Sequence, residues 1–230
     1  MKTTKKQLFG LNRFEIILWT ISAFVICFSF LISRSSDFVS LIGSIIGITS
    51  LIFLAKGYVA GQVLIIVFSV FYGIVSFYNN YYGEMITYLC MTAPMAVVAL
   101  IEWIRHPYKD TKEVAVSKIS KHHLCLIPVS SILVTAVFYF ILKALGNASL
   151  IISTLSITTS FIAAYLTAIR SPYYALGYAC NDIVLIVLWT VASVNNIENI
   201  PMIACFVMFF VNDMYGFYSW KKMEKRQNKE

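Results

Sequence analysis

The amino-acid sequence predicts an all-α membrane protein with eight transmembrane helices, and three observations carry that prediction. Hydrophobic residues make up 59% of the 230 residues and charged residues only 13%, where a soluble domain has about 25% charged residues. The mean hydropathy is +0.77. Apolar runs close to the ~20 residues that a spanning helix needs recur along the chain, separated by short polar breaks.

The first predicted span needs separate justification, because it follows a basic leader (Lys2, Lys5 and Lys6) as a signal peptide would. Its apolar run is too long for a signal peptide, and the stretch Ser33–Asp37 offers no A-x-A-like cleavage site. We therefore interpret it as a helix. The expected spans are residues 14–33, 38–55, 59–78, 84–104, 124–143, 149–169, 174–194 and 199–220.

The distribution of basic residues predicts how these spans are oriented. With both termini inside, 16 of the 18 Lys and Arg residues fall in inner segments, and only Arg34 and Lys143 fall outside. This distribution follows the positive-inside rule, and removal of any one span would spoil it. We expect a multi-pass protein of the bacterial inner (plasma) membrane with cytoplasmic N- and C-termini.

The chain also contains an internal repeat of three helices. The spans within 38–104 and 149–220 have the same lengths and spacings, and Asn79–Asn80 and Trp103 recur as Asn195–Asn196 and Trp220. Because a three-helix unit ends on the opposite side from its start, the fifth helix restores the direction, and the two bundles are parallel. The expected domains are a tail and extra N-terminal helix (1–37), the first three-helix repeat (38–104), a basic cytoplasmic loop and linker helix (105–148), the second three-helix repeat (149–220) and a basic cytoplasmic tail (221–230).

Two Asn-Asp pairs lie inside predicted spans, Asn181–Asp182 in the seventh and Asn212–Asp213 in the eighth. A carboxylate in hydrocarbon costs at least ~2.5 kcal/mol, so such residues usually face a bundle interior or a watery cavity. Asp182 lies roughly 12 Å from the inner end of its helix and Asp213 roughly 10 Å from the inner end of its own, at ~1.5 Å rise per residue. Antiparallel neighbours therefore bring both pairs to one level.

Aromatic residues share a helix face with the first pair. Tyr174, Tyr178, Asn181, Asp182 and Trp189 follow helical spacing, and Cys205, Met208, Asn212 and Gly216 form a stripe on the last helix. Rings can stack on a flat heterocycle, and Asn and Asp can bond its sugar hydroxyls or ring nitrogens. The alternative is that the Asn-Asp pairs bond each other and only lock the helices together.

The sequence lacks the residue patterns that disulfide frameworks, metal sites and nucleic-acid binding require. The five cysteines form no C-x-x-C, and His122–His123 have no H-x-x-x-H partner, so we expect no disulfide framework, metal or cofactor. The net charge of +7 lies at membrane ends, which favours anionic lipids of the cytoplasmic face over nucleic acid as partner. A homo-oligomer is compatible with the sequence.

Two short strings, YGFYSW (Tyr215–Trp220) and YYGEM (Tyr81–Met85), resemble motifs of the PnuC family of nicotinamide riboside transporters. The string YGFYSW, at the end of the last predicted span, is similar to the family's G-[FY]-x-x-W ending. The string YYGEM is similar to the family's Y-G-D turn, with Glu84 in place of Asp. The resemblance implies a SWEET-like fold and uptake of a nucleoside-like molecule by facilitated diffusion with metabolic trapping.

Two departures from the family pattern bear on the substrate. Tyr174 to Tyr178 stand where the family has W-x-x-W, and Tyr88 stands where it has a glutamine. A (deoxy)ribonucleoside, thiamine or riboflavin therefore stays open beside nicotinamide riboside. The expected substrate-binding residues are Tyr174, Tyr178, Asn181, Asp182, Trp189, Asn212, Asp213 and Tyr88.

An intramembrane enzyme is the rival class, since two aspartates on adjacent helices also occur in membrane aspartyl proteases. Their G-x-G-D signature is missing, because Phe210-Val211-Asn212 precedes Asp213, and no G-x-S-x-G, H-E-x-x-H or P-loop is present. We therefore expect a carrier and no enzyme. Proton coupling is a second rival, and we favour a uniporter.

Overall fold

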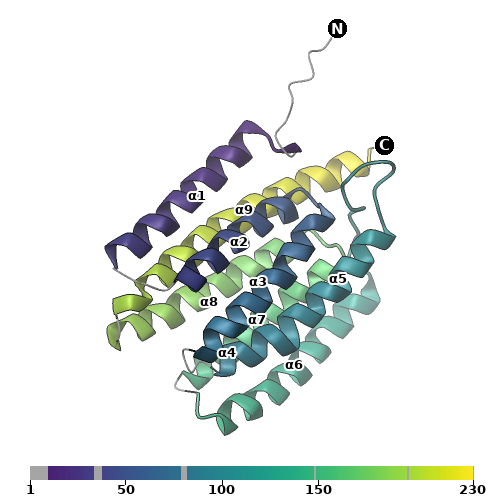
Figure 1. Ribbon diagram of the computed structural model, residues 1–230. Coiled ribbons are helices and arrows are strands. Elements are labelled where there is room, and N and C mark those ends of the chain that lie inside the picture. Colours follow the sequence, from purple (N-terminus) through teal and green to yellow (C-terminus); the bar gives the residue numbers. More distant parts are fainter. Residues whose placement is uncertain (1–9, 34–37, 79–81, 148, 196, 230) are drawn as a thin grey trace.

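A computed structural model shows that the chain is all-helical through the residues it describes, which are 10–33, 38–78, 82–147, 149–195 and 197–229. Figure 1 shows one elongated bundle in which α1 begins and α9 ends at the same end, which we call the terminal end. The helices are α1 (Arg13–Ile32), α2 (Phe38–Ala55), α3 (Val59–Tyr78), α4 (Tyr82–Thr87), α5 (Ala93–Arg105), α6 (Lys121–Ala144), α7 (Leu150–Ala168), α8 (Tyr174–Asn195) and α9 (Ile200–Gln227).

Seven helical stretches of the described chain are long and apolar enough to cross a membrane, and Val59–Ile74 in α3 is a shorter apolar helix. The fourth predicted span is one of the seven, but it is not a single α-helix. It consists of α4, a π-helical turn at Tyr88–Thr92 and α5. The multi-pass membrane class is therefore confirmed.

Pro94 explains the π-helical turn. Its ring nitrogen carries no proton, so the regular i→i−4 bond is missing at this point. The chain instead takes a wider turn, in which Ala93 N donates to Tyr88 O and the Thr92 hydroxyl lies 3.4 Å from the Thr87 carbonyl. Such turns often occur at functional sites, and this one carries Tyr88.

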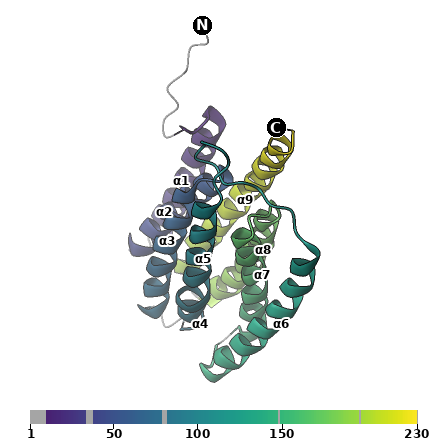
Figure 2. The same ribbon diagram turned by 90° about the vertical axis from the view of Figure 1, so that its right-hand side faces the viewer.

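The helices form two groups of three that meet across the bundle. In one group α3 contacts α2 and α5, and in the other α8 contacts α7 and α9. The groups meet where α2 packs on α9 and α5 packs on α7. Figure 2 shows α6 at the edge of the bundle, where it packs chiefly on α7.

Matching contacts occur where the two groups meet. Trp103 Nε1 donates to the Thr167 carbonyl at 2.9 Å, and Trp220 Nε1 donates to the Leu54 carbonyl at 2.7 Å. Each indole therefore bonds the residue before the last of the facing helix. The two tryptophan rings themselves lie 5.4 Å apart.

The turns that follow α2 and α7 are also alike. Gly57 and Arg170 both have positive φ, 67° and 59°. Gly57 N bonds Leu54 O at 2.8 Å, and Arg170 N bonds Thr167 O at 3.0 Å. The loop between α5 and α6 is bound to both turns, because Val114 N donates to Gly57 O and Ser117 N to Arg170 O. Asn79 and Asn80, and with them half of the predicted asparagine match, lie outside the described residues, as does Asn196.

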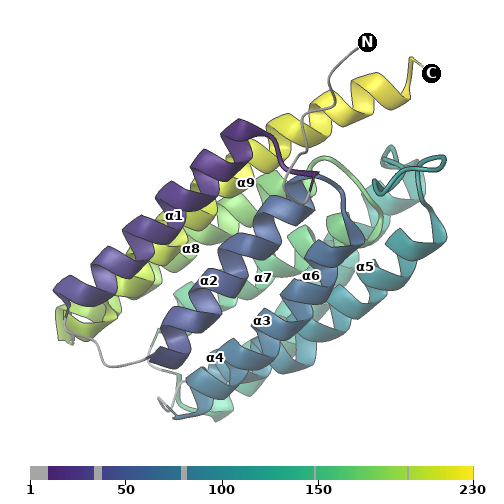
Figure 3. The ribbon, with the colours of Figure 1, turned by 45° about the horizontal axis from the view of Figure 1, so that its top comes forward.

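The extra helix α1 runs beside α9, as Figures 1 and 3 both show, and it also contacts α2. Polar contacts fix it at three levels. The Tyr215 hydroxyl donates to Glu15 Oε1 at 2.8 Å, and Glu15 is only 2% exposed. Trp19 Nε1 donates to Thr49 Oγ1 at 3.0 Å, and Asn212 Nδ2 donates to Ser22 Oγ at 2.9 Å.

Gly177 permits the close approach of α8 to α7. A Cβ at this position would lie 2.9 Å from the Ala163 Cα, whereas a Cβ at Gly43 in α2 would meet nothing within 4 Å. We expect Gly177→Ala to destabilise the protein by about 1–3 kcal/mol through overpacking. Gly43→Ala should be neutral or stabilising, since alanine favours helix by ~1 kcal/mol.

Thermal unfolding of the purified protein in detergent measures the difference between the two variants. A melting temperature for Gly177→Ala equal to that of Gly43→Ala would show that the α7–α8 contact does not depend on this glycine.

Candidate functional site

The bundle brings the two predicted aspartates together. Asp182 on α8 and Asp213 on α9 are both 4% exposed, and both line one cavity. Their carboxyl groups are within reach of a hydrogen bond to each other. Asp182 and Asp213 thus lie at the same depth in the bundle, as helical rise predicts for residues of two packed neighbours, α8 and α9.

The cavity lies between helices of both three-helix groups. Five of the predicted residues line it, Tyr88, Tyr178, Asn181, Asp182 and Asp213. The remaining lining residues are Leu51, Leu54, Ile65, Phe68, Thr92, Ser160, Leu185, Phe206 and Phe209. No Lys, Arg or His from the described part of the chain is among them.

The cavity is small in this conformation. Its volume is about 50 Å³, which is room for a few water molecules and well below the ~300 Å³ of a typical small-molecule site. A ligand larger than water therefore requires the lining side chains or helices to move apart.

Asn181 is oriented by α7. Its Oδ1 accepts hydrogen bonds from the Ser156 hydroxyl at 3.1 Å and the Thr159 hydroxyl at 2.9 Å. Because these two donors fix the oxygen side of the amide, the Nδ2 donors on its other side are directed elsewhere. Asn181 is itself 6% exposed and lines the cavity.

Asn212 is placed differently from the other three polar residues. Its Nδ2 donates to Ser22 Oγ on α1 and, at 2.7 Å, to the Met208 carbonyl. It is absent from the cavity lining. Asn212 therefore joins α9 to α1 on the side of α9 away from the cavity, and its Oδ1 has no hydrogen-bond partner in the described part of the structure.

Aromatic rings close the cavity towards the terminal end. The Tyr178 ring lies 6.2 Å from the Tyr174 ring, which lies 4.9 Å from Trp220, and Trp220 in turn contacts Trp103. Tyr174 is 1% exposed and does not line the cavity. It lies about 12 Å along α8 from Asp182 at the usual helical rise.

A second aromatic cluster closes the opposite side. The Tyr72 and Tyr88 rings lie 4.3 Å apart, and Phe68 contacts both. Trp189 lies close to the Tyr72 hydroxyl. Since Trp189 lies roughly 10 Å along α8 from Asp182, it belongs to this cluster and is not part of the cavity wall.

Sequence reasoning missed the wall that the first half of the chain contributes. Leu51, Ile65 and Phe68 come from α2 and α3, which are mainly apolar and contain no charged residue that would mark a site. Phe206 and Phe209 lie on the same stretch of α9 as the predicted stripe. Their helical spacing to Asp213, at i−7 and i−4, is the signal that could have found them.

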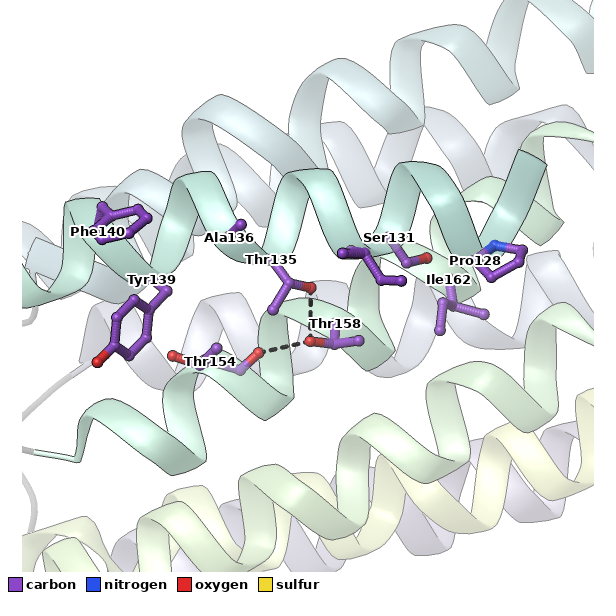
Figure 4. A pocket seen from close by; sticks show the side chains of 10 residues that line it. Pro128, Ser131, Thr135, Ala136, Tyr139, Phe140, Thr154, Thr158 and Ile162 are labelled. Atoms are coloured by element: carbon purple, nitrogen blue, oxygen red, sulfur yellow. Dashed lines mark hydrogen bonds between the residues drawn. The ribbon is translucent and has the colours of Figure 1, made fainter. Parts of the chain in front are cut away.

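Another hollow lies between α6 and α7 and has a different chemistry (Figure 4). Its volume is about 640 Å³, and its lining is apolar apart from hydroxyl groups. The Thr135 and Thr158 hydroxyls bond each other at 2.8 Å, and the Thr158 hydroxyl bonds the Thr154 carbonyl at 2.9 Å, so these groups are satisfied by the helices. None of the eight predicted binding residues lines it.

Comparison with known proteins shows the family. The family model described as nicotinamide mononucleotide transporter matches residues 37–222, which leaves α1 outside. A protein of Neisseria mucosa named nicotinamide riboside transporter PnuC is 26% identical over 97% of this chain and 87% of its own length. A protein of Haemophilus influenzae with the same name is 25% identical over 95% of this chain and 94% of its own.

A solved structure shows the fold. The crystal structure of the vitamin B3 transporter PnuC superposes with a TM-score of 0.81 at 24% identity, covering 95% of this chain and 94% of that one. The family match spans well over half of the sequence and confirms the resemblance to the PnuC proteins. The chain therefore belongs to the nicotinamide mononucleotide transporter family.

Proposed function

We propose that this chain is a membrane carrier for uptake of nicotinamide riboside, which crosses by facilitated diffusion and is trapped by metabolism inside the cell. The observation that carries the proposal is the cavity of a transporter-family bundle, in which two carboxyl groups, an oriented amide and aromatic rings converge. Aromatic walls suit the nicotinamide ring, and Asn181 and the carboxyl groups suit ribose hydroxyls.

The cavity favours the riboside over the mononucleotide. A nucleotide brings a phosphate with nearly two negative charges, which proteins usually bind with Arg or Lys. The described cavity lining offers two aspartates and no basic residue. Relatives with the riboside in their names agree with this preference. A (deoxy)ribonucleoside, thiamine or riboflavin is the alternative substrate on the same fold.

We assign the predicted binding residues different roles. Tyr88, Tyr178, Asn181, Asp182 and Asp213 contact the substrate, as their place in the cavity lining supports. The buried rings of Tyr174 and Trp189 belong to the aromatic layers that must part for the substrate to pass. Asn212 positions α9 against α1 through Ser22.

We also propose the parallel arrangement of the predicted domains, with the residue ranges given above. Supporting it are the matched turns at Gly57 and Arg170 and the reciprocal indole bonds of Trp103 and Trp220. Eight spans then place both termini in the cytoplasm of a bacterial cell, in keeping with the positive-inside distribution. Anionic lipids on that face and a homo-oligomer are compatible partners.

A second candidate is an intramembrane hydrolase, which one observation favours. Two carboxyl groups in hydrogen-bonding reach resemble the shared-proton pair of aspartic proteases. The transporter family of the chain argues for the carrier, and the binding test below separates the two.

Replacement of Asn181 by alanine tests the substrate site. We expect Asn181→Ala to weaken nicotinamide riboside binding about 10-fold or more, because its oriented amide donors are lost in a buried site. Isothermal titration calorimetry on purified protein measures this, with thiamine, riboflavin, and ribo- and deoxyribonucleosides titrated in turn. Asn199→Ala is the control and should bind as the wild type does, because Asn199 lies just before α9, remote from the cavity, and bonds Ala192 O.

An unchanged affinity in Asn181→Ala would show that the Asn181 amide does not contribute to substrate binding. Wild-type protein that binds none of these compounds but cleaves a peptide would favour the hydrolase instead.

The second test concerns coupling. If the two carboxyl groups exchange no proton with either side during the cycle, a pH gradient does not drive uptake into proteoliposomes that are held at zero membrane voltage. We therefore expect the initial rate to change less than about twofold when a pH gradient of either sign is imposed. Accumulation above the outside concentration that depends on the pH gradient would instead show proton coupling.

A further inference from the structure

The cavity is unbalanced in charge. Asp182 and Asp213 line it, while the described lining residues include no Lys, Arg or His. Two carboxyl groups this close disfavour double ionisation, because like charges at short range repel each other. An uncompensated charge in this setting costs several kcal/mol.

One carboxyl oxygen is also left without a partner. Asp182 Oδ2 is buried and makes no hydrogen bond within the described structure. Buried polar atoms are nearly always satisfied by protein, water or ligand. An acceptor of this kind beside the cavity indicates that the site is completed by a group that bears positive charge or donates a hydrogen bond.

The surrounding rings favour an organic cation over a metal ion. Tyr88 lies near Asp182, and Tyr178 lies near both aspartates, and aromatic faces attract cations. Ca²⁺ or Mg²⁺ instead requires about six oxygen ligands. The described residues contain no group of three or more His, Cys, Asp or Glu that could hold a metal.

We propose that the Asp182–Asp213 pair makes this carrier selective for heterocycles that carry a fixed positive charge on a quaternary ring nitrogen. The inference rests on the proposed function and narrows its substrate class. The ring nitrogen of nicotinamide riboside is such a centre, because its bond to ribose leaves a pyridinium charge that does not titrate. The thiazolium of thiamine shares this property, while riboflavin and common deoxyribonucleosides are neutral.

A matched pair of ligands tests the proposal. Addition of a hydride to the ring of nicotinamide riboside gives the dihydro form, which keeps the amide and the ribose but has no charge. We expect wild-type protein to bind the oxidised form at least about 10-fold more tightly in calorimetry at neutral pH, which corresponds to about 1.4 kcal/mol.

Two isosteric variants locate the source of this preference. Asp182→Asn and Asp213→Asn each remove one carboxyl without leaving a cavity, so the affinities for the two forms should come within about threefold of each other. Asn181→Ala should weaken the binding of both forms to the same extent, because the neutral amide does not distinguish a charged ring from an uncharged one. Thermal unfolding of each variant establishes that it is folded.

The outcomes separate this inference from the proposed function. Equal affinity of the wild type for both forms would overturn charge selection and leave the carrier for nicotinamide riboside intact. A preference that persists in both asparagine variants would assign the selectivity to other residues. Binding of neither form would overturn the proposed function and this inference together.

Discussion

A pair of carboxyl groups buried in an apolar bundle is the constraint on which the rest of the structure depends. Asp182 and Asp213 can lie together only if α8 and α9 keep one rotation and one depth. Neighbouring helices fix both. The Ser156 and Thr159 hydroxyls of α7 hold Asn181, beside the first aspartate, and Ser22 of α1 holds Asn212, beside the second. Small and hydroxyl-bearing residues do this work because they allow close helix contact in lipid.

The two three-helix groups share their turns and indole contacts but not their chemistry. The carboxyl and amide groups of the cavity come from α8 and α9, and the first group contributes rings and aliphatic side chains such as Phe68 and Leu51. Two helix groups with matching turns thus hold a site whose carboxyl and amide groups come from only one of them. Helix α1, which lies outside the family match, packs on α9 of the polar group and on α2 of the other group.

The sequence predicted the membrane class, the order of the helices and the common level of the aspartates, because hydropathy and helical rise are local properties. It did not predict that Asn212 faces α1, since helix rotation depends on the packed partner, and Asp213, one residue on, points about 100° away. The π-helical turn was missed for a related reason. Pro94 predicts that the fourth span is interrupted. Whether the helix kinks or forms a wider π-helical turn there depends on the helices packed against it.

The lack of a basic residue in the described cavity lining has a consequence for energetics across the bilayer. A carrier that takes in a cation without a counter-ion and returns empty is electrogenic, so the resting voltage of the cell acts on each cycle. A voltage of 100 mV, negative inside, is worth ~2.3 kcal/mol per elementary charge, or roughly 50-fold accumulation at equilibrium. Such a carrier would concentrate its substrate before any metabolic trapping, and a depolarised cell would lose that advantage at once.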